Sequence, residues 1–264
     1  MNIDIKDLHF TYPTGVKALY GVSLFINSGE QVAIVGQNGS GKTTLVKHFN
    51  GLLQPTSGSV TIGDWDTAKV PVAELAARVG YVFQNPDEQL FCRTVGEEVE
   101  FGPRNLGFEA GKKESLVQDA LNLVELRNKT DMNPYDLSAT WRKMVALASI
   151  VAMDTSIVIF DEPTTGQDAA NVLRIAHVVG ELRRRGKTVI TITHDIDFCA
   201  ENFERVIALS QGKILLDGPA SNVLGQEETL AQTYVDPPQL TRLGKRLGFN
   251  KTVRNQEEFL ATLR

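Results

Sequence analysis

One short stretch constrains this chain more than any other part of it. Residues 36–43 read Gly-Gln-Asn-Gly-Ser-Gly-Lys-Thr and match the phosphate-binding pattern G-x-x-x-x-G-K-[ST]. The glycines let the backbone turn tightly and approach a phosphate chain without clashes from Cβ atoms, so that several N–H groups can point inward. The apolar residues 31–35 predict a buried strand before the motif, and residues 44–50 predict the start of a helix after it. In that context a chance glycine-rich turn is disfavoured, and the sequence predicts a nucleoside triphosphate site.

Each polar residue of this loop has an expected partner on the nucleotide. Lys42 supplies a positive charge for the β- and γ-phosphates, and Thr43 supplies a hydroxyl for Mg²⁺. The helix that follows adds the positive end of its dipole. The residues expected to surround the nucleotide here are Gly36, Gln37, Asn38, Gly39, Ser40, Gly41, Lys42, Thr43 and Thr44.

Two adjacent carboxylates end a second apolar strand. Residues 157–160 read Ile-Val-Ile-Phe, and Asp161 and Glu162 follow them. A carboxylate at the end of a strand beside a phosphate-binding loop can hold Mg²⁺ through water, which suits Asp161. Glu162 would then face the γ-phosphate and orient or deprotonate the attacking water. Many buried strands end in an acidic turn, so the catalytic interpretation of this pair depends on the phosphate-binding loop.

The composition is that of an ordinary globular protein. The 264 residues are 42% hydrophobic and 22% charged, with a net charge of −5. This charge does not suggest nucleic acid as a partner. No apolar run approaches the roughly 18 residues of a membrane span, and the amino terminus lacks a signal-peptide pattern, so the expected compartment is the cytoplasm. Cys92 and Cys199 form no C-x-x-C motif and predict neither a metal site nor a redox framework.

The order of the predicted elements indicates an α/β fold. Strands are predicted at residues 3–10, 18–26, 31–35, 60–63, 79–83, 157–160 and 189–191, with a final hairpin at 206–209 and 213–216. Helices are predicted at residues 72–77, 95–106, 112–124, 138–153 and 169–185. Alternating strands and helices favour a mainly parallel sheet covered on both faces. The helical block at about 85–152 interrupts the alternation and predicts a subdomain, and the polar residues 226–264 predict a small carboxy-terminal extension.

Six motifs in a fixed order give the chain a resemblance to a known family. They are the loop at 36–43, Gln84, the helix start Leu137-Ser138, Asp161-Glu162-Pro163, Asp168 and His194. In this order they resemble the motifs of ATP-binding-cassette (ABC) ATPases across residues 1 to about 220. The resemblance implies an α/β P-loop NTPase with a RecA-like core, an antiparallel β subdomain, a helical subdomain and a small carboxy-terminal extension. It places the ABC ATPase domain at residues 1–225 and the extension at 226–264.

The resemblance also implies roles for single residues. Tyr12 is expected to stack on adenine, and Gln84 to touch Mg²⁺ or the lytic water. Asp168 matches the loop that lines the dimer interface, and His194 matches the histidine that contacts the γ-phosphate. Ser138 is expected to cap the γ-phosphate held by the other subunit of a dimer. The implied cofactors are ATP and Mg²⁺, the implied catalytic residues are Glu162, Gln84, His194 and Lys42, and the implied metal ligands are Thr43, Gln84 and Asp161.

Two further segments resemble one branch of this family. Residues 84–89 resemble the segment after the glutamine loop in energy-coupling-factor (cobalt, nickel and vitamin) transporter ATPases, and the tail around Pro237-Pro238 resembles their carboxy-terminal extension. This implies an ATP-hydrolysing subunit at the cytoplasmic face of the cell membrane that powers import of a metal ion or vitamin. The implied partners are a second ABC ATPase subunit, a transmembrane coupling subunit and a substrate-binding membrane protein.

Two alternative functions remain open from the sequence. A soluble ABC ATPase of DNA repair or translation is disfavoured by the acidic net charge and by the absence of coiled-coil heptads. A regulatory nucleotide-binding subunit that hydrolyses poorly is disfavoured because Glu162, Gln84 and His194 are all present.

One motif departs from the pattern of the family. The family signature reads Leu-Ser-Gly-Gly-Gln, whereas residues 137–141 read Leu-Ser-Ala-Thr-Trp. Thr140 replaces a glycine that allows close approach to phosphate, and a β-branched side chain is crowded there. Trp141 replaces a small polar residue and is expected to stand against the γ-phosphate. The change is either tolerated or weakens one half-site. We favour the weakened half-site, which predicts a heterodimer with one fast and one slow site.

Overall fold

The computed structural model describes residues 1–263, and the chain folds into two units. Unit 1 consists of Met1–Val70 and Ile190–Arg264, and unit 2 consists of Pro71–Val189. The boundary between them falls inside strand β8 (Thr188–Ile192). The predicted helical subdomain at about 85–152 lies within unit 2, and the predicted extension at 226–264 lies within unit 1. The domain boundaries themselves remain predictions.

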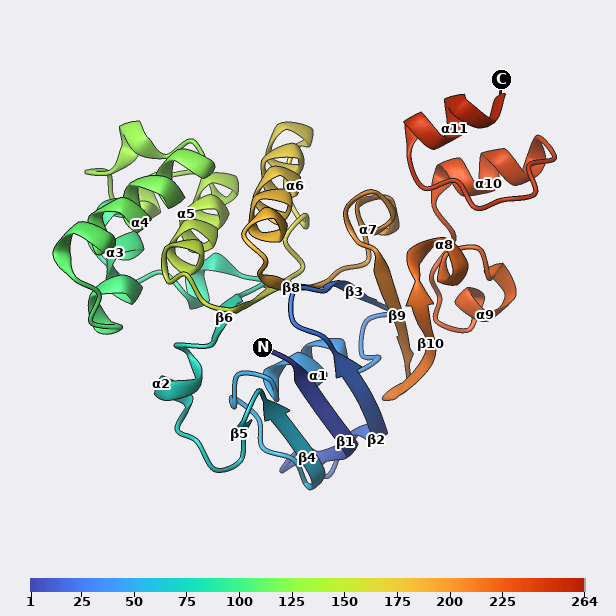
Figure 1. Cartoon of the computed structure of the whole chain (residues 1–264), viewed down its shortest axis with the longest axis horizontal. Helices are drawn as coiled ribbons and strands as arrows, with labels where there is room; N and C mark the ends of the chain where they lie inside the picture. The colour runs from blue at the N-terminus through green and yellow to red at the C-terminus, as the bar shows by residue number, and fades with distance from the viewer. Residues whose placement is uncertain (264) are drawn as a thin grey trace. The chain divides into compact units, whose positions relative to one another are not determined.

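Unit 1 contains an antiparallel sheet, as the fold class requires. Its strands are β1 (Ile3–Thr11), β2 (Lys17–Ile26), β4 (Ser57–Ile62) and β5 (Trp65–Asp66), in the order β2-β1-β4-β5 (Figure 1). Apolar residues alternate along β1, but the period shifts between Ile5 and Leu8, where the pairing with β2 is irregular and Asp7 has a φ of 46°. This irregularity lets Ile3 and Ile5 before it and Leu8 and Phe10 after it all stay buried.

The second group of strands in unit 1 supports the phosphate-binding loop. Strand β3 (Gln31–Val35) is buried along its whole length and pairs in parallel with β9 (Arg205–Ser210), as expected for a strand covered on both faces. β9 then turns through Gln211 and Gly212, both with positive φ, into the antiparallel β10 (Lys213–Pro219). Helix α1 (Lys42–Lys47) follows β3, and helix α7 (Ile196–Asn202) follows β8. The antiparallel pair β9–β10 confirms the hairpin predicted at residues 206–209 and 213–216.

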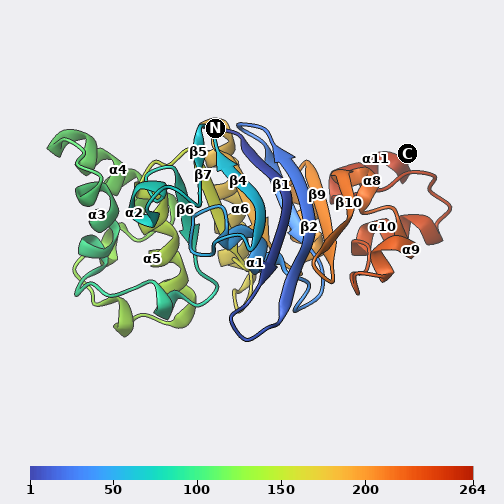
Figure 2. The ribbon, with the colours of Figure 1, turned by 90° about the horizontal axis from the view of Figure 1, so that it is seen from below.

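The last residues of the chain form short helices. They are α8 (Ala220–Val223), α9 (Glu227–Ala231), α10 (Gln239–Arg246) and α11 (Gln256–Leu263), and Figure 2 shows them gathered beside β10. The Phe249 and Phe259 rings pack 5.4 Å apart, and the Thr241 hydroxyl donates to the Val253 carbonyl at 2.6 Å. The extension is therefore an ordered part of unit 1.

Unit 2 combines two parallel strands with a group of helices. Strands β6 (Val79–Val82) and β7 (Ile157–Asp161) pair in a register that sets Tyr81 opposite Ile159. Helices α3 (Val95–Asn105), α4 (Ala110–Leu123) and α5 (Ala139–Ala152) pack against one another (Figure 1). Among them, α5 carries the densest run of buried residues. The remaining elements are α2 (Val72–Leu75), α6 (Ala169–Arg184) and the 3₁₀ turns η1 (Pro86–Glu88), η2 (Arg127–Lys129) and η3 (Pro134–Asp136).

The strands and helices that the sequence predicts agree with these bounds to within a few residues. Helix α1 begins at Lys42 rather than at Thr44, because Gly41 in a left-handed conformation already acts as its N-cap. The sequence does not predict strand β5 or helices α7, α8, α9, α10 and α11, because each is too short to show a clear periodic pattern. Within residues 1–263, no helix has both the length and the apolar character needed to cross a membrane.

Candidate functional site

The glycines of the phosphate-binding loop are required by its backbone and its packing. Gly36 has a φ of 148°, and a Cβ atom on it would lie 2.1 Å from the carbonyl oxygen of Leu209 on β9. Gly41 has a φ of 103°, and a Cβ atom there would lie 2.9 Å from the Ala18 carbonyl oxygen. Residues with side chains are strained in such conformations. Glycine is therefore required at both positions for the loop to pack against its neighbouring strands. This requirement is independent of any contact with phosphate.

Lys42 lies at the start of α1 with its ammonium group folded back over the loop. Nζ donates to the carbonyl oxygens of Gly36 at 2.7 Å and of Gln37 at 2.9 Å, and the side chain is 6% exposed. Both acceptors belong to the loop itself, so the positive charge is held where the sequence predicts the β- and γ-phosphates.

Tyr12 and His194 also lie beside this loop within unit 1. The Tyr12 hydroxyl and the Thr44 hydroxyl share a hydrogen bond of 2.7 Å, and Phe10 packs edge-on against the Tyr12 ring. This places the predicted adenine-stacking residue next to the first turn of α1. His194 is exposed and lines an open pocket of about 590 Å³ together with Gly36, Gln37, Asn38 and part of the carboxy-terminal extension. The structure therefore brings Tyr12, His194 and the loop together.

In unit 2, Asp161 has a partner that the sequence did not predict. Its carboxylate is at the end of β7, is 3% exposed, and accepts a hydrogen bond of 2.6 Å from the Tyr81 hydroxyl. This length is typical of a hydroxyl that donates to a carboxylate. Burial raises the pKa of Tyr81, and the charge of Asp161 raises it further, so Tyr81 remains a donor at neutral pH. Tyr81 fixes one carboxylate oxygen of Asp161 in place.

Glu162 adopts a backbone conformation that is unusual for a residue with a side chain. Its φ is 50°, a left-handed conformation that costs about 1–3 kcal/mol and persists only when neighbouring groups hold it. Lys143 on α5 donates from Nζ to the Glu162 carbonyl at 2.7 Å, and the Thr165 hydroxyl donates to the Glu162 carboxylate at 3.3 Å. Burial lowers the pKa of Lys143, while the charges of Glu162 and Asp161 act in the opposite direction. Lys143 is a second residue that the sequence did not predict.

The altered signature begins α5. Ser138 is the N-cap residue, and its hydroxyl accepts from the Trp141 N–H at 3.4 Å and shares a hydrogen bond of 2.7 Å with the Thr140 hydroxyl. The Trp141 ring lies near two cations of the same unit, 5.1 Å from Arg174 Cζ and 5.4 Å from Lys129 Nζ. Cation–π contacts thus hold the ring within the subunit, and its predicted place against the γ-phosphate of another subunit remains a prediction.

Asp168 is connected to this arrangement through α6. It is the N-cap residue of that helix and accepts from the Asn171 N–H at 2.8 Å. Asn171 in turn accepts from Arg174 Nη1 at 2.7 Å, and Arg174 is the residue that faces the Trp141 ring. The loop predicted to line a dimer interface is thus tied to the altered signature by a short series of contacts.

The segment after Gln84 is fixed by polar contacts within unit 2. Gln84 itself is exposed. The Gln89 amide group accepts from the Phe83 N–H at 3.1 Å and donates to the Ala146 carbonyl at 2.7 Å, so Gln89 anchors this segment to α5. The buried Glu98 carboxylate accepts from the N–H groups of Phe91 and Cys92 at 2.9 and 2.8 Å. The Phe91 side chain, by contrast, is 62% exposed.

The comparisons with known proteins identify the class of this chain. Its sequence matches the ABC transporter family over residues 19–165, and the chain belongs to that family as an ATP-binding protein with an ABC ATPase domain. It is 41% identical over 259 residues to an ABC transporter ATP-binding protein of Caldanaerobacter subterraneus, covering 98% of this chain and 45% of that relative. It is 38% identical over 243 residues to the energy-coupling factor transporter ATP-binding protein EcfA of Methanocaldococcus jannaschii, covering 91% of this chain and 87% of EcfA.

The chain thus spans less than half the length of some curated relatives that it matches and most of the length of others. Among solved structures, CbiO1 of Clostridium perfringens, part of the ABC transporter complex CbiONQ, superposes with a TM-score of 0.78 at 31% identity, covering 93% of this chain and 98% of CbiO1. The ATP-binding cassette MJ0796, a dimer in a post-hydrolysis state with ADP and phosphate, gives 0.75 at 29% identity and covers 83% and 98% of the two chains. These comparisons confirm the P-loop NTPase fold and the ATPase class.

Proposed function

We propose that this chain is the ATP-hydrolysing subunit of an energy-coupling-factor transporter that imports a metal ion or a vitamin. The observation that supports this most is the similarity to CbiO1, which covers 93% of the chain, whereas the cassette MJ0796 covers 83%. The similarity to EcfA over 91% of the chain points in the same direction. A soluble ABC ATPase or a regulatory subunit has no comparable observation in its favour.

The proposed chemistry gives a role to each predicted site residue. Lys42 holds the β- and γ-phosphates, the loop N–H groups bind phosphate oxygens, and Tyr12 stacks on the adenine. Glu162 orients or deprotonates the attacking water, with His194 and Gln84 as further contacts to the γ-phosphate and the water. The oxygen donors of Thr43, Gln84 and Asp161 suit Mg²⁺, a hard cation that prefers oxygen ligands, and Tyr81 already orients Asp161. The bound Mg²⁺ would neutralise charge on the phosphates.

The proposed partners follow from the same similarity. They are a second ABC ATPase subunit that forms a heterodimer with this chain, a transmembrane coupling subunit and a substrate-binding membrane protein. Dimer closure on ATP and opening after hydrolysis would move the membrane partner. The chain would lie at the cytoplasmic face of the membrane as a peripheral subunit.

Co-purification tests this assignment. The chain, tagged at its amino terminus, is purified from detergent-solubilised membranes, and the recovered proteins are identified by mass spectrometry. We expect a second ABC ATPase and polytopic membrane proteins in stoichiometric amounts. Recovery of the chain alone from the soluble fraction, with no membrane protein enriched over an untagged control, would contradict the proposal.

Phe91 gives a sharper test of coupling to a membrane partner. Its backbone is fixed by Glu98, its ring packs edge-on against Phe101 at 4.7 Å, and the ring is nevertheless largely exposed. We expect Phe91→Ser to reduce transport several-fold while the basal ATP hydrolysis of the isolated subunit stays within about twofold, because an exposed aromatic anchor serves binding more than folding. Gln89 does not suit this test because it anchors the fold.

The matched control is Phe25→Ser, which removes another exposed aromatic side chain, from β2. Transport is measured for both variants in the reconstituted complex, and basal hydrolysis is measured on the isolated subunits. Equal loss of both activities in Phe91→Ser would mean that Phe91 serves the fold or the nucleotide site instead.

A further inference from the structure

The carboxy-terminal extension makes a direct backbone contact with the phosphate-binding loop. The N–H group of Gln37 donates to the carbonyl oxygen of Thr233 at 3.0 Å. The carbonyl group of Gly36 accepts from Lys42 Nζ at 2.7 Å. The N–H of Gln37 and the C=O of Gly36 belong to one planar peptide unit, so they turn together. This peptide unit is therefore held from both sides, by the Lys42 ammonium group and by the Thr233 carbonyl group.

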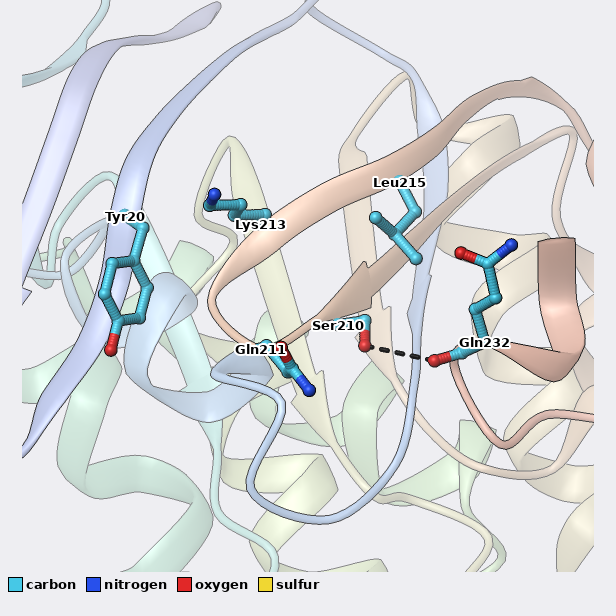
Figure 3. Close-up of a pocket in the computed structure, with 6 residues that line it drawn as sticks. All are labelled: Tyr20, Ser210, Gln211, Lys213, Leu215 and Gln232. Atoms are coloured by element: carbon cyan, nitrogen blue, oxygen red, sulfur yellow. Dashed lines mark hydrogen bonds between the residues drawn. The ribbon is translucent and has the colours of Figure 1, made fainter.

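Thr233 is itself rigidly placed. It is fully buried, its hydroxyl donates to the Leu230 carbonyl at 2.7 Å, and its N–H donates to the same oxygen at 2.8 Å. On one side, the Gln232 carbonyl accepts from the Ser210 hydroxyl at 3.2 Å, the bond drawn in Figure 3. On the other side, Tyr234 has a φ of 56° and donates its N–H to the Ala231 carbonyl at 3.0 Å. The direction of the Thr233 carbonyl is thus set by the turn that ends α9.

The loop has a second support, from the β9–β10 hairpin. Gly212 donates to the Ser40 carbonyl at 2.9 Å and accepts from the Tyr20 N–H at 3.0 Å. Figure 3 shows this hairpin, marked by Gln211, and the end of α9, marked by Gln232, around one open pocket of about 410 Å³. The hairpin lies within residues 1 to about 220, which resemble ABC ATPases, whereas Thr233 lies in the extension. The support at Gln37 is therefore a contribution of the extension.

The support from Thr233 affects where the positive charge of Lys42 is held. Lys42 Nζ is held by the carbonyl oxygens of Gly36 and Gln37, which flank the Gln37 N–H. If the Thr233 carbonyl turns away, the Gly36–Gln37 peptide loses its restraint on that side. Rotation of the peptide then moves an acceptor of the Lys42 ammonium group and changes the start of the loop.

We propose that the carboxy-terminal extension positions the phosphate-binding loop through the Thr233 carbonyl, and that the extension thereby sets the affinity of this subunit for nucleotide. Thr233 is a positioning residue that acts through Gln37 and Lys42. The inference rests on the proposed nucleotide site at residues 36–44. Because coupling between two sites is reciprocal, bound nucleotide must in turn stabilise the turn at residues 230–235.

Tyr234 allows the turn to be changed without altering a residue of the loop, although its side chain lines the open pocket of about 590 Å³ beside Gly36 and Gln37. Its side chain is 79% exposed, so substitutions there remove no core packing. Proline cannot adopt a φ of 56°, lacks the N–H that bonds to Ala231, and restricts the backbone of the residue before it, which is Thr233. Glycine accepts the positive φ without strain and is the matched control.

The main experiment compares Tyr234→Pro with Tyr234→Gly in the full chain. We expect Tyr234→Pro to raise the Kd of Mg-ATP, and the KM for hydrolysis, by about 3- to 10-fold, the effect of one lost hydrogen bond, with kcat within twofold. Tyr234→Gly is expected to keep both constants within about twofold of wild type. Hydrogen exchange followed by mass spectrometry is expected to show faster exchange at residues 36–38 in Tyr234→Pro only, and slower exchange at residues 230–235 of the wild type when Mg-ATP is bound.

A second variant keeps the proposal testable if Tyr234→Pro fails to fold. Thr233→Val keeps the volume of the side chain but removes its hydrogen bond to Leu230, and we expect a shift of about 2- to 3-fold in the same direction. Unchanged affinity and unchanged exchange at residues 36–38 in a folded Tyr234→Pro or Thr233→Val protein would overturn the proposal.

Lys42→Ala separates the assignment of the nucleotide site at residues 36–44 from the inference about Thr233. If Lys42→Ala leaves the affinity unchanged, the nucleotide site itself is wrong; if Lys42→Ala weakens binding and the turn variants do not, only the inference about Thr233 is wrong.

Discussion

Glu162→Gln is expected to abolish ATP turnover while ATP binding is retained. A general base or water-orienting carboxylate contributes about 10²–10⁴-fold, so hydrolysis should fall at least a hundredfold. The structure explains why binding should survive. Glu162 is held in its left-handed conformation mainly through its backbone carbonyl, which accepts from Lys143, and a glutamine keeps that contact. Phosphate release and retained nucleotide are measured on the same preparation at saturating Mg-ATP.

Glu109→Gln is the matched control, because it makes the same chemical change at an exposed glutamate that precedes α4. It is expected to match wild type in both measurements. A Glu162→Gln protein that hydrolyses ATP near the wild-type rate would show that another group activates the water.

The second large effect on the rate of ATP hydrolysis is expected from the altered signature at residues 137–141. In the proposed dimer, the start of α5 faces the γ-phosphate held by the other subunit, and Thr140 stands where the family has a glycine. The Thr140 hydroxyl shares a hydrogen bond with the Ser138 hydroxyl, so the substitution also engages the retained serine of the signature. Loss of one well-aimed donor costs about 10²–10³ in rate, and we expect Thr140→Gly to recover much of that in the isolated chain. Steady-state hydrolysis at saturating Mg-ATP measures the gain.

Trp141→Gln separates the two changes in the signature. Because the Trp141 ring contacts Arg174 and Lys129 within unit 2, its removal is expected to give no gain in rate and to destabilise the fold by about 1–2 kcal/mol, from two lost cation–π contacts. A gain in rate from Trp141→Gln alone would place the ring in the nucleotide site. A wild-type chain that already turns over at several per second, about the median for enzymes, and is unchanged by Thr140→Gly would show that the signature is tolerated.

Much of the fold could be predicted because its signals are local. The buried strands β3 and β7 are continuous apolar runs, and the glycine pattern at 36–43 fixes the turn between β3 and α1. Helix N-caps are also local signals in the sequence. Ser138 and Asp168 are the N-cap residues of α5 and α6, which begin one residue later at Ala139 and Ala169. The start of α1 was misplaced by two residues because a left-handed glycine can cap a helix without any side-chain signal.

The supporting residues of the site could not be predicted because their contacts are distant in sequence. Tyr81 and Asp161 are 80 residues apart, and only the register between β6 and β7 brings them together. The contact between Gln37 and Thr233 joins two backbone groups and leaves no trace in residue type. The cation–π contacts of Trp141 could not be predicted either, because its neighbours Lys129 and Arg174 come from η2 and α6.

Nucleotide affinity of wild type and Lys42→Ala tests the central claim most directly. Isothermal titration calorimetry of Mg-ATP is run on both proteins and on Lys47→Ala, which removes a lysine from the same helix. We expect saturable binding at one site per chain in wild type and Lys47→Ala. Lys42→Ala should bind about 10- to 100-fold more weakly, since a hydrogen bond to a charged group contributes about 1.5–3 kcal/mol. Equal affinity in Lys42→Ala and wild type, with both proteins folded, would contradict the assignment of the phosphate-binding loop.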